Sequence, residues 1–227
     1  MIQCSYICVF GEEDTVGNNE KKVPEVVIKR LPRYYRYLSD LSAQDVHRIS
    51  SGQLSELMSV TASQIRQDFN YFGGFGQQGY GYNVDYLRDE IANILGLSDG
   101  NTMIIVGAGN LGSALANHAS FEKRGFKLVG IFDSDESKVG REIRGIRIMH
   151  QAQLAEFVRE HRVDIAILTI PSTAVHDTAQ LLVKNGVKGL LNFSRAELDL
   201  PKDVAVEHVH LSDSLMTLGY KIKEYQK

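Results

Sequence analysis

The sequence is poor in cysteine, has no excess of positive charge and contains no long hydrophobic run. Cys4 and Cys8 are the two cysteines among 227 residues. Their spacing cannot complete a four-thiolate zinc site, and two thiols do not make a disulfide framework. The formal net charge is −3, so any contact with a nucleic acid must be local. No apolar run reaches the roughly 18 residues that a membrane span needs.

The first 22 residues carry no repeat typical of a helix or strand, and we expect them to form a flexible extension. The apolar stretch from Ile2 to Phe10 is too short for a membrane span and has no basic segment before it, which makes it a poor signal peptide. We therefore expect a cytoplasmic protein in which Cys4 and Cys8 are incidental thiols of a reducing compartment.

A glycine motif lies near the centre of the chain. The apolar run Thr102–Val106 leads into Gly107-Ala-Gly109-Asn-Leu-Gly112, and a helical pattern rich in Ala and Leu comes next. This context is typical of a dinucleotide-binding βαβ unit. Gly107 permits the tight turn, Gly109 lets the backbone approach a pyrophosphate, and Gly112 lets the helix pack closely on the sheet.

A carboxylate follows at the distance that such a unit requires. Asp133 ends the apolar run Lys127–Phe132, about 20 residues beyond Gly112. There it can accept hydrogen bonds from the adenosine ribose and repel a 2′-phosphate, which favours NAD(H) over NADP(H). Two alternatives remain: a glycine turn that only packs a helix on a sheet, or a related α/β domain that binds coenzyme A.

Strands and helices continue to alternate after Asp133. The predicted strands are 146–149, 164–170, 187–193 and 204–209, and the helices between them are 151–161 and 173–184. Apolar runs without alternation, such as Ile165–Ile170, are typical of parallel strands covered on both faces. The segments Thr169–Pro171 and Asn192–Phe193 should lie at the carboxyl edge of a Rossmann sheet, where ligands bind. The predicted cofactor-binding residues are Gly107, Ala108, Gly109, Asn110, Leu111, Gly112, Asp133, Lys138, Thr169, Pro171, Asn192 and Phe193.

The segment before the glycine motif has the pattern of a helix-turn-helix. A helical pattern runs from Pro24 to Leu41, with Pro32 suited to a first turn. Ser50–Gln53 and Thr61–Gln64 each offer a capping box, so two short helices separated by Ser59 and Val60 are expected. The glycines and aromatics of Tyr71–Tyr82 favour a β-hairpin tip, which makes a winged helix-turn-helix. The alternative is a small helical packing domain. Asp85–Leu97 is predicted to be a linker helix.

The last helix, from Ser212, carries a single apolar stripe. Leu211, Leu215, Leu218, Ile222 and Tyr225 recur at helical spacing. No later element is present to cover this stripe, so it packs either on a partner subunit or on its own domain. The pattern alone does not separate these two alternatives.

Together these motifs resemble the redox-sensing transcriptional repressor Rex family of bacteria, over residues 23–225. The matching segments are Arg30–Leu38, Tyr71–Gly73, Gly79–Tyr82, Val106–Gly112, Phe132–Asp135 and Leu191–Asn–Phe193. The resemblance implies a homodimer that binds a palindromic double-stranded operator and is released by NADH. NAD⁺ competes with NADH and leaves repression in place. It also implies that the C-terminal helix is exchanged between subunits. The expected fold class is therefore α/β: a winged helix-turn-helix (23–85), a Rossmann NAD(H)-binding domain (86–210) and a dimerisation helix (211–227).

The predicted DNA-binding surface departs from the family pattern. The predicted contacts are Arg33, Tyr35, Arg36, Ser63, Gln64, Arg66, Gln67, Gln77 and Gln78. Family members commonly carry basic residues at the positions of Gln67, Gln77 and Gln78. Between residues 23 and 85, six basic residues balance six acidic ones, whereas phosphate neutralisation supplies most non-specific affinity. Glutamine can still read adenine, so altered sequence preference and weaker binding are both open.

The residues of the switch also differ from the family. The resemblance implies a network that joins an arginine of the first helix, here Arg36, to a tyrosine and an aspartate, whose positions are taken by His118 and His210. A common glutamine after Pro171 is replaced by His176. One hypothesis is a diverged paralogue with a different ligand response and added pH sensitivity, because histidine titrates near neutrality. The alternative is that these histidines are ordinary surface or packing residues with no part in the switch.

Three functions are compatible with the sequence. The leading one is an NAD(H)-responsive repressor that is not an enzyme and has no catalytic or metal-binding residues. The second is an NAD-dependent oxidoreductase with an accessory domain, for which His176 is the one candidate acid or base. The third is a family member that keeps the dinucleotide and dimer parts but has altered or lost operator binding.

Overall fold

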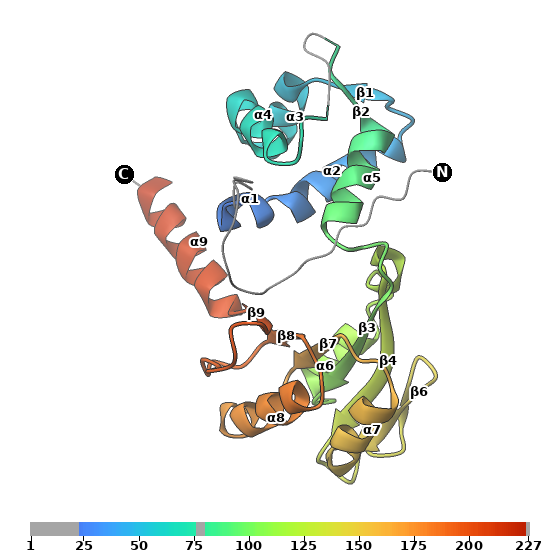
Figure 1. Cartoon of the computed structure of the whole chain (residues 1–227). Helices are drawn as coiled ribbons and strands as arrows, with labels where there is room; N and C mark the ends of the chain where they lie inside the picture. Colours follow the sequence, from blue (N-terminus) through green and yellow to red (C-terminus); the bar gives the residue numbers. More distant parts are fainter. Residues whose placement is uncertain (1–22, 76–79, 226–227) are drawn as a thin grey trace, which may run out of the picture. The chain divides into compact units, whose positions relative to one another are not determined.

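The computed structural model of the chain describes residues 23–75 and 80–225. These residues form two compact units that divide between Ile91 and Ala92, within helix α5 (Val84–Ile94) (Figure 1). The predicted N-terminal extension, Cys4, Cys8, Gln77 and Gln78 lie outside the described residues. Within the described ranges, no helix is long and apolar enough to cross a membrane. The expected domain limits at residues 85 and 210 stay predictions.

The first unit is built from short helices. They are α1 (Glu25–Ile28), α2 (Leu31–Ser42), α3 (Ser51–Met58), α4 (Ala62–Asn70) and the start of α5. Pro32 occupies the first turn of α2, where its missing N–H leaves no helical hydrogen bond unmade. The predicted helix-turn-helix is confirmed as α3 and α4, and the predicted linker helix as α5.

The caps of α3 and α4 explain where these two helices begin. At Ser50 the predicted capping box is complete: its hydroxyl accepts from Gln53 N–H, and the Gln53 side chain accepts from Ser50 N–H. Ser59 ends α3 in the left-handed conformation, with φ 53°. The second predicted box is half wrong. Thr61 accepts from Gln64 N–H, but the Gln64 side chain bonds to Asp68 instead of returning to the cap.

The wing is paired differently from the predicted hairpin. β1 (Arg48–Ile49) pairs antiparallel with β2 (Tyr82–Asn83), and Val84 N–H donates to His47 O. Residues 71–75, at the start of the predicted hairpin segment, lie in turn or irregular structure and form no strand. The hydrogen-bonding partner of β2 is therefore a two-residue strand in the connection before α3, which is distant from β2 in the sequence.

A charged cluster lies inside the first unit. Asp68 on α4 has no exposed surface, and its carboxylate accepts two hydrogen bonds from the Arg30 guanidinium, both at 2.7 Å. Tyr34 OH and the Gln64 amide donate to the same carboxylate at 2.8 and 2.9 Å. Burial alone raises the pKa of Asp68, but these hydrogen bonds outweigh it and hold the pKa below the usual value. Asp68 therefore ties α4 to α2 as a fully paired carboxylate.

Aromatic rings pack beside this cluster. The ring of Phe69 lies 5.0 Å from that of Tyr34, 5.6 Å from Phe75 and 5.2 Å from Tyr82, centroid to centroid. These tilted and edge-to-face contacts join α2, α4, the segment after α4 and β2. The aromatic residues at the two ends of the glycine-rich segment are thereby attached to the helices.

The second unit contains a seven-stranded sheet in the order β5-β6-β4-β3-β7-β8-β9. Its strands are β3 (Asn101–Val106), β4 (Phe126–Asp133), β5 (Glu142–Ile143), β6 (Ile146–His150), β7 (Ile165–Leu168), β8 (Gly189–Asn192) and β9 (Ala205–His208). All pairs are parallel except β5 with β6. The order reverses between β3 and β7, as in a doubly wound dinucleotide-binding sheet. The predicted Rossmann alternation is confirmed, and β5 is an added antiparallel edge.

The two faces of the sheet are covered unequally. One face packs against α7 (Leu154–Glu160) and α8 (Ser172–Lys184) through Leu154, Val158, Val175, Ala179 and Leu182. The other face packs against the short α6 (Asn110–Ala116) and Phe121. Between β8 and β9 the chain has no helix, and an apolar groove of about 350 Å³ opens over β7, β8 and β9.

The last helix, α9 (Leu211–Tyr225), follows β9 (Figure 1). All of its residues are exposed in the described part of the chain, including its apolar stripe. This observation disfavours the alternative in which the stripe packs on its own domain.

The buried carboxylate of Asp68 yields a stability prediction. Asp68→Asn removes the charge that pairs with Arg30, so we expect the free energy of unfolding to fall by about 3 kcal/mol at pH 7. Urea denaturation followed by tyrosine fluorescence measures this. Because the pKa of Asp68 is lowered in the folded state, its contribution is present above the unfolded pKa and is lost as the pH falls. The difference between variant and wild type should therefore shrink below about pH 4.

Asp45→Asn is the matched control for this substitution. Asp45 is exposed, lies in the same unit and has φ 56°, a conformation that asparagine tolerates. We expect it to change the free energy of unfolding by less than about 0.5 kcal/mol. Equal effects of the two substitutions would contradict a special role for Asp68.

Candidate functional site

The turn between β3 and α6 lies where the strand order of the sheet reverses. Gly107 has φ +101°, and its N–H donates to Phe132 O at 2.7 Å. A Cβ at Gly107 would lie 2.6 Å from the carbonyl oxygen of Thr169. The Thr169 hydroxyl in turn donates to Gly107 O at 2.8 Å. Glycine is therefore required here both by the backbone conformation and by the close approach of the chain after β7.

The other two glycines of the motif differ in their surroundings. A Cβ on Gly112 would collide with Gly107 O and lie 2.8 Å from the Thr169 hydroxyl oxygen. Gly109, the N-cap of α6, has φ −72°, and a Cβ there would meet nothing within 4 Å. Gly112 is therefore needed for the packing of α6 on the turn, whereas the space beside Gly109 is open for a ligand.

Asp133 reaches from the end of β4 to this turn. Its carboxylate accepts from Ala108 N–H at 2.7 Å, from Asp135 N–H at 2.8 Å and from Lys138 Nζ at 3.1 Å. Burial alone raises the pKa of Asp133, but these partners outweigh it, so the pKa lies below the usual value. The carboxylate is thus ionised and braces the glycine turn. The ammonium group of Lys138 also neutralises part of the charge that was expected to repel a 2′-phosphate.

A cavity of about 350 Å³ opens beside the glycine turn. Four of the predicted cofactor residues line it: Ala108, Gly109, Asn110 and Lys138. Gly107, Gly112 and Asp133 support its wall through the contacts above, while Leu111 does not line it. A cavity lined by the glycine turn, polar side chains and a cationic group has the composition needed for the adenosine and phosphate part of a dinucleotide.

Sequence reasoning missed several lining residues of this cavity: Ser113, Asn117, Arg141, Glu142, Ile143 and Ile148. Ser113 and Asn117 lie four residues apart on the helical pattern after the glycines, so they share one face of it. That spacing could have identified them. Arg141 directly precedes β5 and Glu142 is its first residue, and the sequence carried no clear pattern for this strand.

The residues predicted at the ends of β7 and β8 serve two different purposes. Thr169 contacts the glycine turn, and Pro171 is the exposed N-cap of α8. Asn192 has no exposed surface: its amide accepts from Ser194 N–H and donates to Ala196 O and to His208 Nδ1. Asn192 therefore organises the loop after β8. Ligand binding by Thr169, Pro171, Asn192 and Phe193 stays a prediction.

A second candidate site is the outer face of α4. Ser63, Arg66, Gln67 and Asn70 are exposed and recur at helical spacing, so they share one face. Arg66 donates to Ser51 Oγ at 2.9 Å. Gln64, which was predicted to contact DNA, is half-buried, and its side chain bonds to Asp68. The second helix of a helix-turn-helix presents such a polar face to the major groove.

The residues predicted on α2 form a small cluster around one ring. The guanidinium groups of Arg33 and Arg36 lie 5.8 and 5.6 Å from the centroid of Tyr37. Arg36 is exposed, and Tyr35 is half-buried. The Tyr37 ring thus holds two arginines that can present their charges to phosphates.

The predicted switch residues lie in both units. Arg36 belongs to the first unit, and His118 and His210 belong to the second. His118 is exposed and packs against Phe121, with ring centroids 5.0 Å apart. His210 is half-buried directly before α9. A network that joins these three residues stays a prediction.

Two protein families match parts of the chain. Residues 22–70 match the family described as "Putative DNA-binding protein N-terminus", and residues 99–196 match the CoA binding domain family. The first match covers α1 to α4. The second covers the βαβ region for which coenzyme A was an alternative ligand.

Relatives match over nearly the whole chain. A protein named redox-sensing transcriptional repressor Rex from Caldicellulosiruptor saccharolyticus is 53% identical over 205 residues, which are 90% of this chain and 94% of the relative. The protein of the same name from Clostridioides difficile is 48% identical over 209 residues, 92% of this chain and 99% of the relative.

Solved structures extend this similarity to the fold. RSP in complex with β-NAD⁺ and operator DNA has a TM-score of 0.86 and 51% identity, and the match covers 91% of this chain and 95% of that one. RSP in complex with β-NADH has a TM-score of 0.84 and 49% identity, covering 90% of this chain and 96% of that one. RSP is described as a Rex-family repressor.

The unequal surroundings of the glycines generate a paired prediction. Gly109→Ala should fold with unchanged stability, because nothing lies within 4 Å of the added methyl group. It should weaken NADH binding at least about tenfold, since the methyl group occupies the space through which a pyrophosphate approaches the backbone. Titration of NADH fluorescence measures the affinity.

Gly112→Ala should behave in the opposite way. Its methyl group collides with the backbone at Gly107, so we expect the free energy of unfolding to fall by about 3 kcal/mol. Thermal and urea unfolding separate the two variants. A stable Gly109→Ala protein that binds NADH as the wild type does would contradict this location for the dinucleotide.

Proposed function

Because the chain belongs to the Rex family of redox-sensing transcriptional repressors, we propose that it represses transcription by binding a palindromic operator as a homodimer, and that NADH releases it. The observation that carries the proposal is the similarity to RSP, a repressor solved with β-NAD⁺ and operator DNA and also with β-NADH. One protein of this fold therefore holds both forms of the cofactor, and it holds the oxidised form together with DNA.

In physical terms, NADH binding and operator binding are linked through an equilibrium between two forms of the dimer. A DNA-competent dimer and an incompetent dimer interconvert, and NADH shifts the balance only by its tighter binding to the second form. NAD⁺ competes for the same site and leaves the first form populated. By linkage, operator DNA must weaken NADH binding by the same factor by which NADH weakens operator binding.

The chain is a repressor and not an enzyme, in agreement with its Rex relatives. The rival prediction of an oxidoreductase depended on His176 as an acid or base. His176 lies on α8, and its Nε2 is 3.0 Å from the Gln180 side-chain nitrogen on the same helix. The hydrogen-bond partner of His176 is thus the exposed side-chain amide of Gln180, one turn later on α8.

We place the DNA contacts on α2, α4 and the wing. The exposed face of α4 presents Ser63, Arg66 and Gln67 to the base edges, and Arg33, Tyr35 and Arg36 lie on α2 within reach of phosphates. Gln64 acts indirectly, because its amide holds Asp68 and so orients α4. Gln77 and Gln78 belong to the wing by sequence. The balanced charge of this region favours a shallow salt dependence of operator binding.

Two surfaces of the second unit support the homodimer. The apolar groove over β7, β8 and β9 and the apolar stripe of α9 both lie exposed in the described chain. A C-terminal helix exchanged between subunits would cover apolar surface on both copies. Arg36, His118 and His210 are proposed to couple this helix to the DNA-binding unit. As a regulator of transcription, the protein is proposed to act in the cytoplasm.

The proposed function predicts a ligand-dependent loss of operator binding. Fluorescence anisotropy with a palindromic Rex-type duplex should give binding without ligand and with NAD⁺, with an affinity that falls, though not steeply, as salt is added, and loss of binding with NADH. NADH fluorescence measures ligand binding in the same samples. Binding of NADH to a protein that never binds the duplex would contradict the repressor and favour the alternative in which operator binding is lost.

Substitutions on α4 separate phosphate contacts from base contacts. Arg66→Ala should weaken binding to all sequences and make the salt slope shallower by about 0.9 if Arg66 neutralises one phosphate. Gln67→Ala should leave the salt slope unchanged and relax preference at one base pair, by about 1–3 kcal/mol if Gln67 reads adenine. Arg159→Ala, an exposed arginine on α7, is the control and should change neither. Identical behaviour of all three variants would rule out α4 as the recognition helix.

A further inference from the structure

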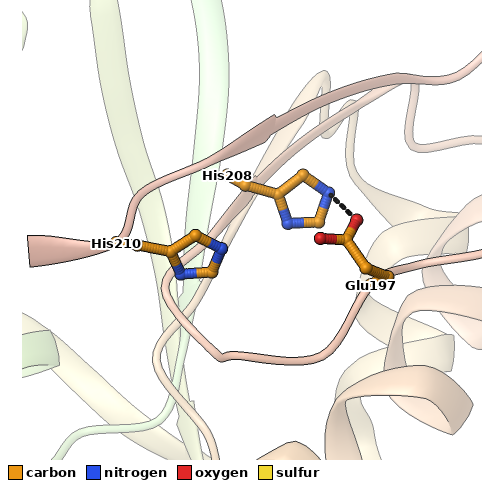
Figure 2. A group of neighbouring side chains, drawn as sticks. All are labelled: Glu197, His208 and His210. Atoms are coloured by element: carbon orange, nitrogen blue, oxygen red, sulfur yellow. Dashed lines mark ion pairs between the residues drawn. The ribbon is translucent and has the colours of Figure 1, made fainter. Parts of the chain in front are cut away.

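Three potential metal ligands gather where the C-terminal helix begins. Glu197 lies in the loop between β8 and β9, His208 is the last residue of β9, and His210 directly precedes α9. One ligand atom from each residue lies within 4.8 Å of the others. Figure 2 shows the Glu197 carboxylate beside the His208 ring, with the His210 ring on the other side of His208. His208 Nε2 lies 3.6 Å from Glu197 Oε2.

The local backbone explains why the two imidazoles lie together. His208 ends a strand, and side chains two residues apart on an extended chain point to the same side. The two rings are accordingly stacked, with centroids 6.0 Å apart. The H-x-H pattern is visible in the sequence, but Glu197 is eleven residues before His208 and is brought to it only by the loop.

The ligand types point to a particular class of ion. Two imidazoles and one carboxylate suit zinc and neighbouring divalent transition metals, whereas calcium and magnesium prefer oxygen ligands. Ligand atoms around a tetrahedral zinc ion are about 3.4 Å apart, from bond lengths of about 2.1 Å. The pair His208 and Glu197 already approaches this spacing, and Glu197 is an exposed loop residue that can move closer.

A hydrogen bond from Asn192 to His208 opposes the binding of an ion at this cluster. Its amide nitrogen lies 3.2 Å from His208 Nδ1 and is oriented by its bond to Ala196 O. An amide nitrogen only donates, so the proton of neutral His208 lies on Nε2, facing Glu197. An ion bound at Nε2 moves that proton to Nδ1 and breaks the hydrogen bond to Asn192. The expected affinity is therefore weaker than that of a preformed structural zinc site.

We propose that Glu197, His208 and His210 bind one divalent transition-metal ion, of which zinc is the reference case, and that the ion fixes the start of α9. Asp213 N–H donates to His210 O at 3.1 Å, so His210 is already part of the first turn of the helix. Coordination of its side chain together with Glu197 joins the loop after β8 to that turn. The direction in which α9 leaves the sheet then depends on the ion.

The first test is the stoichiometry and affinity for Zn²⁺, measured by competition with a chromophoric chelator. Full-length protein carrying Cys4→Ser and Cys8→Ser excludes binding by the thiols. We expect one ion per chain, and an affinity at least about tenfold weaker in Glu197→Gln and in His210→Gln. His176→Gln, on α8 outside the cluster, is the matched control and should bind as the parent does. Absence of binding, or equal affinities in all variants, would overturn the proposal.

The second test addresses α9 itself. Amide hydrogen exchange at residues 211–215 should slow on addition of Zn²⁺ in the parent and not in Glu197→Gln, whose substitution lies outside the helix. Unfolding curves verify that the variants fold. Zinc binding with unchanged exchange in α9 would refute the second half of the proposal while leaving the site itself in place.

Discussion

The second unit depends on the close approach of two chain segments at the point where the strand order reverses. There Gly107 and Gly112 contact Thr169, and the Thr169 hydroxyl donates to the carbonyl of Gly107. Asp133 holds the same turn from β4 by accepting from Ala108 N–H. The ends of β4 and β7 are thus tied to the turn after β3 by the side chains of Asp133 and Thr169, at a place where Gly107 and Gly112 leave no room for a Cβ. The space beside Gly109 remains open, because nothing lies within 4 Å of the position that a Cβ would take there.

The first unit relies on a different device to present its surface. Asp68 and Arg30 neutralise one another inside the domain, so this pair contributes neither attraction nor repulsion toward phosphates. Gln64 also donates to Asp68, so both polar side chains on the inner side of α4 are engaged in hydrogen bonds inside the domain. Only Ser63, Arg66, Gln67 and Asn70 are left on its outer face. A domain of balanced charge therefore concentrates its recognition in a few polar side chains of one helix.

Much of this could be predicted because the signals are local. The glycine spacing, the caps at Ser50 and Thr61 and the stripe of α9 each depend on residues a few positions apart. The parts that could not be predicted depend on distant partners. β2 pairs with two residues that precede α3, Asn192 is occupied by the loop that follows it, and Gln64 turns inward because a buried carboxylate lies one turn later. Glu197 joins His208 and His210 only through the folded loop.

The uneven covering of the sheet has a consequence for the protein in the cell. One face carries α7 and α8, while the other carries the short α6 and leaves an apolar groove, and the following helix α9 is exposed in the described chain. If these surfaces are covered by a second copy, folding and association draw on the same free energy, and apparent stability rises with protein concentration by mass action. A regulator of this kind is then most exposed to proteolysis when it is scarce. Its abundance would act as a determinant of its own half-life.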